Sequence, residues 1–332
     1  MAIASFKPGH LDIRYLSDGE IATDRTSLGL VSFGDTCLPE IPALRLQVAL
    51  DPLDVTDAHR FELLGANGAI RQGQDSAIRF ASDDQLLLAS IEVDEAAQGG
   101  IEAAAEYAYR AIQDFNARST FPCLLRMWNY LDAINEGDGD DERYRRFCAG
   151  RARGFGQIAA ENYPAASALG HQRRTGQLQV YWLAGRNPGL QLENPRQLSA
   201  YRYPRIHGSV SPSFARACLL PGGPLLISGT ASIVGHASLH AGDVQAQLQE
   251  TLNNLDALII SATQHAPHLP RHLGRSSRLK IYVRNPGHAA EIAACLRTRY
   301  GAQLQFLMLA ADICRRELLL EIDCAHGLTA GS

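Results

Sequence analysis

The chain contains the same order of expected strands and helices twice, and this internal duplication constrains its fold more than any other feature. The C-terminal copy begins near Ser211, and its expected elements are a strand at 224–229, a helix from Asp243, a strand at 279–284, a helix at 288–300 and strands at 304–310 and 317–323. Asp243 can cap the first helix, in which Leu248, Leu252 and Leu255 recur at helical spacing. The order β-α-β-α-β-β predicts an α+β unit with both helices on one face of a mixed sheet.

The N-terminal half repeats this order more loosely. Its expected elements are a helix at 103–115, a strand at 124–131, a helix at 141–153 and strands at 178–185 and 197–204. The strand at 178–185 resembles 304–311, and the strand at 197–204 stands where 317–324 stands, so that Tyr201 corresponds to Glu321. We therefore expect a degenerate N-terminal unit, residues 1–205, followed by a second unit, residues 206–332.

Composition indicates an ordinary globular protein and excludes several functions. Of the 332 residues, 46% are hydrophobic and 20% are charged, and the net charge of −4 provides no basic field for nucleic acid. No apolar run approaches the ~18 residues of a membrane span, and residues 1–7 lack the apolar core of a signal peptide. The seven cysteines are scattered without a C-x-x-C pair, which is typical of reduced thiols in a cytoplasmic protein.

Two weak motifs do not predict a cofactor. The pairs His236/His240 and His268/His272 have i, i+4 spacing, but they lack a helix signal and a third ligand. The G-x-G-x-x-A match at 154–159 follows an expected helix, whereas a dinucleotide site requires a preceding strand. We therefore expect neither a metal nor a nucleotide cofactor.

The second unit resembles the Rid (YjgF-like) fold in the segments SFARA…GGPLLISGTAS, GDVQAQLQETLNNLDALIISA, LKIYVRN and LLLEID. Members of that family are trimers with sites between subunits, and many hydrolyse imines. The imine hydrolases carry an arginine in the penultimate strand, whereas residues 304–309 contain none. The resemblance thus implies the fold rather than imine hydrolysis, and a non-catalytic metabolite-binding protein is an alternative.

The whole chain resembles a narrower family, the chorismatases, in which a Rid-like domain follows a degenerate copy of itself. The matching stretches are RMWNYLDAIN…ERYRRFCAGRARGF (126–155), AYRYP (200–204), SPSFARA (211–217), SGTASIVGH (228–236), LNNLDALI (252–259), LKIYVR (279–284) and ADICRRELLLEID (311–323). The resemblance implies a bacterial enzyme of aromatic biosynthesis that removes pyruvate from chorismate without a cofactor, in a pocket between the two halves. The chain would be a monomer or a homo-oligomer, with a trimer as one possibility.

Chorismate is a dianion, so its binding requires fixed cations, and the arginine fork suits a carboxylate. Candidates for this clamp are Arg145, Arg202 and Arg216, with Tyr130, Tyr201 and Tyr203 as hydroxyl donors. Alternation along a strand at 197–204 would direct Arg202 away from its two neighbouring tyrosines. Weaker alternatives are Arg126, Arg284 and Arg297.

Glu321 is the candidate catalytic acid. Cleavage of the enol-pyruvyl ether requires a proton at the methylene carbon, and a carboxylic acid with a raised pKa in an apolar strand can deliver it. Leu318, Leu319, Leu320 and Ile322 flank Glu321, which matches the family's catalytic glutamate.

Two residues bear on the choice of product. The family's 3-hydroxybenzoate members have a cysteine seven residues before the catalytic glutamate and alanine in the SGTA strand, where Cys314 and Ala231 stand. Bulkier walls would exclude the water that hydrolysis requires. The resemblance thus implies 3-hydroxybenzoate and pyruvate as products, with 4-hydroxybenzoate as a possible third. The alternative is hydrolysis to a dihydroxy-cyclohexadiene carboxylate.

Overall fold

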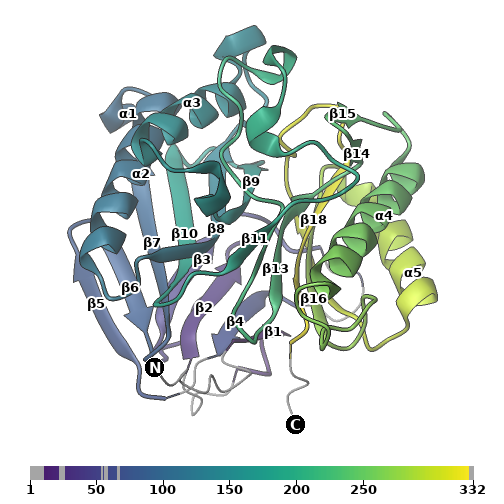
Figure 1. Cartoon of the computed structure of the whole chain (residues 1–332), viewed down its shortest axis with the longest axis horizontal. Helices are drawn as coiled ribbons and strands as arrows, with labels where there is room; N and C mark the ends of the chain where they lie inside the picture. Colours follow the sequence, from purple (N-terminus) through teal and green to yellow (C-terminus); the bar gives the residue numbers. More distant parts are fainter. Residues whose placement is uncertain (1–10, 22–26, 54, 56–58, 66–67, 329–332) are drawn as a thin grey trace.

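The computed structural model describes residues 11–21, 27–53, 55, 59–65 and 68–328. In this part of the chain the strands form three larger sheets around one central core, and helices cover the outer faces of two of them (Figure 1). Among these residues no helix has the length and apolar character needed to cross a membrane.

The N-terminal sheet carries no helix in the described residues. It consists of β1 (Asp12–Leu16), β2 (Ser27–Phe33), β3 (Leu44–Val48) and β4 (Phe61–Gly65), in the order β1-β4-β2-β3. Strands β2 and β3 are parallel, and the other pairs are antiparallel. This sheet lies outside the duplicated pattern and was not predicted.

The first repeat follows directly. Its sheet has the order β5-β6-β7-β10-β8-β9 and contains β5 (Arg71–Asp75), β6 (Ile78–Ser82), β7 (Leu86–Asp94), β8 (Cys123–Asp132), β9 (Ala165–His171) and β10 (Gln177–Gly185). Its helices are α1 (Glu95–Gln98), α2 (Ile101–Arg118) and α3 (Arg143–Phe155). Helices α2 and α3 can pack closely because Gly150 and Gly154 have no Cβ. A Cβ at either position would overlap the backbone of α2.

The second repeat has the corresponding sheet, β11-β12-β13-β18-β16-β17. Its elements are β11 (Leu190–Leu192), β12 (Ala217–Leu219), β13 (Leu225–Thr230), β14 (Ile233–Val234), β15 (Ala237–Ser238), α4 (Val244–Thr263), β16 (Ser277–Val283), α5 (Ala289–Tyr300), β17 (Gln305–Ala310) and β18 (Leu320–His326). Asp243 caps α4 by accepting a hydrogen bond from the Ala246 backbone N–H, as predicted. Short 3₁₀ turns occur at η1 (Gly139–Asp141), η2 (Ala160–Asn162), η3 (Ala200–Arg202), η4 (Arg205–His207) and η5 (Pro286–His288).

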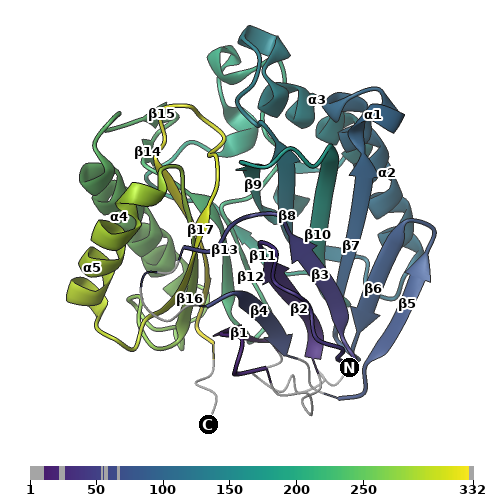
Figure 2. The same ribbon diagram turned by 180° about the vertical axis from the view of Figure 1, so that it is seen from behind.

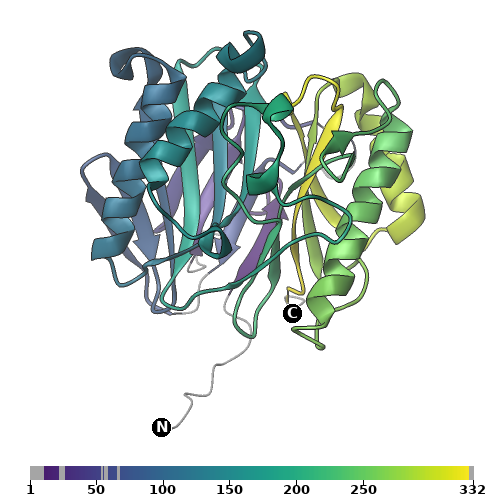
Figure 3. The ribbon, with the colours of Figure 1, turned by 45° about the horizontal axis from the view of Figure 1, so that its top comes forward.

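The identical strand order of the two repeats confirms the predicted fold class. In each repeat the parallel pair, β8 with β9 or β16 with β17, is separated in sequence by one helix. Helices α2 and α3 cover the outer face of the first sheet, α4 and α5 cover that of the second, and the sheets lie between the helical layers (Figure 3).

The predicted register of the first repeat was wrong. Strand β10 lies in the middle of its sheet, as β18 does, and is therefore the counterpart of β18 rather than of β17. The counterpart of β17 is β9, whose small residues gave no strand signal. The segment 197–204 contains the turn η3 (Ala200–Arg202) and forms no strand, so Tyr201 does not correspond to Glu321. Strand β11 lies before residue 206 in the sequence, yet it pairs with β12 of the second repeat. The boundary between the two units at residue 205 stays a prediction.

The inner faces of all three sheets share one apolar core. Phe33 of β2, Leu88 of β7 and Leu226 of β13 are buried in it together. Figure 2 shows the N-terminal sheet alongside the sheets of the two repeats. The repeats also join through their backbones, because Gly170 of β9 and Asp312 exchange two hydrogen bonds of 2.8 and 3.0 Å. This junction fixes the two walls of the cavity described next.

Candidate active site

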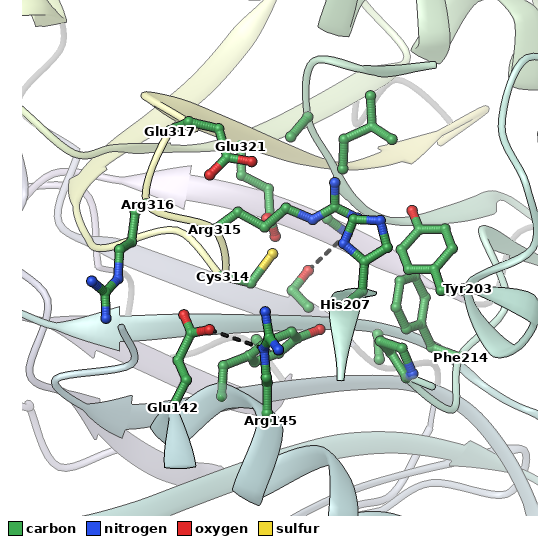
Figure 4. Close-up of a pocket in the computed structure, with 18 of the residues that line it drawn as sticks. Glu142, Arg145, Tyr203, His207, Phe214, Cys314, Arg315, Arg316, Glu317 and Glu321 are labelled. Carbon is green, nitrogen blue, oxygen red and sulfur yellow. Dashed lines mark hydrogen bonds and ion pairs between the residues drawn. The ribbon is translucent and has the colours of Figure 1, made fainter. Parts of the chain in front are cut away.

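A cavity of about 440 Å³ lies between the two repeats. The first repeat contributes residues of α3 and β9 to its wall, and the second contributes residues of β13, β18 and the segment that precedes β18. Glu321, Cys314 and Arg315 enter from the second repeat and face Arg145 of α3, while Tyr203 closes one side (Figure 4). In the described residues no group of three or more His, Cys, Asp or Glu is placed to hold a metal.

Glu321 reaches the cavity because of strand alternation. Its neighbours Leu320 and Ile322 pack into the core beneath α4 and α5, so its own side chain points to the opposite face of β18. Strand β13 passes close to the carboxyl group at Gly229, where a Cβ would overlap it. The glycine in SGTA therefore makes room for the acid.

Burial raises the pKa of Glu321 to about 8, and the negative charge of Asp323 acts in the same direction. The charges of Arg126 and Arg216 oppose this shift. In the described residues no hydrogen bond or ion pair holds the Glu321 carboxyl group. Glu321 is thus protonated at neutral pH and can donate that proton to a bound molecule.

Two buried arginines lining the cavity have unused hydrogen-bond donors. Arg151 is 3% exposed, and among the described residues its Nε and Nη2 atoms have no hydrogen-bond partner. Arg216 donates from Nη2 to the Leu198 carbonyl (2.8 Å) and the Tyr203 hydroxyl (2.7 Å), but its Nε has no partner there. Buried guanidinium groups with free donors favour the binding of an anion.

The cavity mouth carries further polar groups. Arg145 donates from Nε to Glu142 (3.2 Å) and from Nη2 to the Ile206 carbonyl (3.1 Å). Arg315 donates to the His236 carbonyl (2.9 Å) and lies over the ring of Tyr203. Burial and the charge of Arg315 lower the pKa of His207 to about 4, so this imidazole is neutral.

The cavity brings together six residues considered in the sequence: Arg145, Tyr203, Arg216, Ala231, Cys314 and Glu321. It does not include Tyr130, Tyr201 or Arg202. Tyr130 is fully buried in the central core with its hydroxyl 3.4 Å from that of Tyr282. Tyr201 packs against Tyr163, and Arg202, which is also in η3, is exposed. The roles of all nine residues stay predictions.

Arg151, His207 and Arg315 line the cavity and were not predicted. One signal for Arg151 is present in the sequence, because Gly150 and Gly154 have the spacing that brings two helices close together. That approach places the Arg151 guanidinium over the rings of Tyr109 (4.9 Å) and Phe155 (5.2 Å).

Comparison with known proteins gives the family. A 3-hydroxybenzoate synthase from Streptomyces hygroscopicus is 31% identical over 316 residues, which cover 90% of this chain and 91% of the relative. The chain belongs to the chorismatase family. A chorismatase from the same organism is 32% identical over 92% of this chain and 90% of its own length.

Two further findings agree with the chorismatase family. The family model described as chorismatase FkbO/Hyg5-like, N-terminal, matches residues 62–184, which cover most of the first repeat. A chorismatase crystal structure superposes with a TM-score of 0.84 at 30% identity, covering 97% of this chain and all of that one. The resemblance inferred from the sequence motifs is therefore confirmed.

Proposed function

We propose that this protein cleaves chorismate into 3-hydroxybenzoate and pyruvate, with Glu321 as the general acid. The names of the related proteins support the substrate. The observation that carries the proposal is a buried, protonated carboxylic acid in a cavity lined by Arg151 and Arg216, two arginines with unused donors. A dianion with an acid-labile enol ether requires this combination.

The proposed reaction begins with proton transfer from Glu321 to the methylene carbon of the enol-pyruvyl group. The ether carbon then becomes oxocarbenium-like. The C4 hydroxyl oxygen attacks C3 as the bond between C3 and the ether oxygen breaks, so that pyruvate leaves and the hydroxyl proton returns to the Glu321 carboxylate. The C4–O bond of the resulting epoxide then breaks, C3 loses its hydrogen as a proton and the oxygen on C3 gains one, which gives 3-hydroxybenzoate; the products contain all atoms of the substrate and no water is consumed.

Arginines are the proposed partners of the two carboxylates of the substrate. Arg151 and Arg216 line the cavity and have donors without a partner among the described residues, whereas Arg145 is more exposed and already pairs with Glu142. We assign the two buried arginines to the substrate carboxylates and Tyr203, which holds Arg216, to their orientation. Each charge-assisted hydrogen bond of this kind contributes roughly 1.5–3 kcal/mol.

Cys314 and Ala231 both line the cavity and are proposed to exclude water from the reacting carbon. Burial raises the pKa of the Cys314 thiol well above its usual value, so the group is a neutral apolar wall rather than a nucleophile. Without this wall, water could compete with the C4 hydroxyl and give the dihydroxy-cyclohexadiene carboxylate.

The purified protein mixed with chorismate tests the proposal. Pyruvate release is followed with lactate dehydrogenase, and the aromatic products are separated by chromatography. We expect equal amounts of pyruvate and 3-hydroxybenzoate. Pyruvate with the dihydroxy acid would assign the protein to the hydrolytic branch, and binding of chorismate without pyruvate release would refute the enzymatic function.

A further inference from the structure

Asp323 lies two residues after Glu321 on β18 and therefore points to the same face of the strand. Its side chain is buried, and Oδ2 accepts hydrogen bonds from Trp128 Nε1 (3.1 Å), Tyr282 hydroxyl (2.9 Å) and Ser167 Oγ (3.3 Å). These donors come from both repeats. Asp323 is thus a fixed negative charge between them, close to the proposed acid.

Asp323 also pairs with Arg126 of β8. The guanidinium Nη2 lies 3.1 Å from Asp323 Oδ2 and donates to Ser167 Oγ at 2.6 Å. Arg126 is 1% exposed, so its charge is little screened by solvent. Among the described residues, Glu321 forms no ion pair with it, although Arg126 is close enough for its charge to act on Glu321.

Ser167 connects this pair to the acid. Its Oγ accepts the backbone N–H of Gly229 at 2.9 Å, and Gly229 is the residue that packs against the Glu321 carboxyl group. The same hydroxyl contacts both Arg126 and Asp323. The contacts therefore fix where the guanidinium stands relative to the acid.

We propose that Asp323 is a positioning residue that binds the Arg126 guanidinium, prevents it from pairing with Glu321 and so keeps the acid in its proton-bearing form. This inference rests on the proposed function, because only there does Glu321 act as a proton donor. A buried arginine that paired with Glu321 would stabilise the carboxylate, which cannot donate a proton.

The other groups around Glu321 do not replace Asp323. Arg216, before β12, is held by Leu198 and Tyr203, and Tyr144 of α3 and Cys314 are neutral because burial raises the pKa of each. Asp323 therefore supplies the negative charge that pairs with Arg126. Its negative charge is the second-largest cause of the raised pKa of Glu321, after burial.

A purely structural role and a positioning role predict different results. If Asp323 only joined the repeats, Asp323→Asn and Arg126→Met would each lower stability without a directed effect on proton transfer. If Asp323 holds the Arg126 guanidinium away from Glu321, the two substitutions have opposite effects. Asp323→Asn removes a negative charge near Glu321, whereas Arg126→Met removes a positive one. The alkaline limb of the pH profile, where Glu321 loses its proton, distinguishes these cases.

The experiment measures kcat/KM for pyruvate release against pH. We expect the alkaline limb to move down by about one pH unit or more in Asp323→Asn, since an uncompensated arginine lowers a neighbouring carboxyl pKa by about 1–3 units. It should move up in Arg126→Met and return near the wild-type position in the double variant. Asp256→Asn, which breaks an arginine pair (3.0 Å) between α4 and α5, is the matched control and should leave the limb in place.

A second readout does not depend on turnover. Infrared titration follows the protonated carboxyl band that disappears in Glu321→Gln, and its midpoint should shift in the same directions as the pH profile. If the wild type releases no pyruvate but these shifts occur, the proposed function fails while the role of Asp323 stands. Unchanged midpoints in Asp323→Asn and Arg126→Met would overturn the inference. If Asp323→Asn does not fold, an unchanged midpoint in Arg126→Met alone overturns it.

Discussion

Replacing Glu321 with glutamine should stabilise the protein at neutral pH while it removes the proposed acid. Burial raises the pKa of Glu321 to about 8, whereas a glutamate carboxyl group in the unfolded chain has a pKa near 4.5. Between these values the folded protein binds more protons than the unfolded chain, so the free energy of unfolding falls as the pH rises. Glutamine has almost the same shape and remains neutral at every pH.

The size of the effect follows from this pKa difference. A pKa that is one pH unit higher in the folded protein than in the unfolded chain corresponds to about 1.4 kcal/mol. At pH 7, ionisable Glu321 therefore reduces the free energy of unfolding by about 3 kcal/mol relative to a permanently neutral side chain. The substitution breaks no hydrogen bond or ion pair, because the Glu321 carboxyl group makes none with the described residues. The gain should vanish near pH 4.5 and become constant above pH 8.

Urea unfolding of wild type and Glu321→Gln at several pH values between about 4.5 and 8.5 measures this difference. Glu317→Gln, at the cavity mouth, is the control of opposite sign. Burial tends to raise the pKa of Glu317, but the Ser238 hydrogen bond and the Arg315 charge lower it overall, so its ionised form stabilises the fold above the unfolded pKa. A stability difference for Glu321→Gln that is the same at all pH values, or a loss of stability at pH 8, would refute the reasoning.

Three further predictions concern activity. Because Glu321 acts in its protonated form, kcat/KM should fall above pH about 8, and Glu321→Gln should lower kcat by roughly 10²–10⁴-fold; a flat alkaline profile would exclude this acid. Arg151→Met and Arg216→Met should each weaken chorismate binding by about tenfold or more in calorimetry, and normal affinity in both would place the clamp elsewhere. Cys314→Ala, and more so with Ala231→Gly, should yield some dihydroxy acid beside 3-hydroxybenzoate, whereas an unchanged product ratio would make Cys314 a structural thiol.

Much of the fold could be predicted because its helices and central strands have strong patterns. Leu248, Leu252 and Leu255 form the buried side of α4, as their spacing predicted. The N-terminal sheet could not be predicted from the duplication, since its short strands have no counterpart in the second repeat. The apolar run of β10 fits either closing strand of a unit, and only the strand order shows that it is the counterpart of β18.

The candidate site contains residues that the local sequence pattern could predict and others that it could not. Glu321 stands out because a charged residue interrupts an apolar strand, and the structure places it in the cavity. Tyr201 and Arg202 were assigned to a strand whose residues form a turn, so the expected alternation did not apply. The burial of Arg151 depends on the packing of α3 against α2, for which the spacing of Gly150 and Gly154 is the one signal in an otherwise polar helix.

The position of β18 determines when the site can form during synthesis. This strand follows every other strand in the described chain, yet it lies in the middle of its sheet, between β13 and β16. The sheet of the second repeat therefore remains split until β18 leaves the ribosome and inserts, and the proposed acid arrives with it. The first repeat closes in the same way when β10 inserts between β7 and β8. The nascent chain thus carries the buried arginines Arg151 and Arg216 long before it carries Glu321, and we expect it to stay inert toward substrate until β18 has inserted.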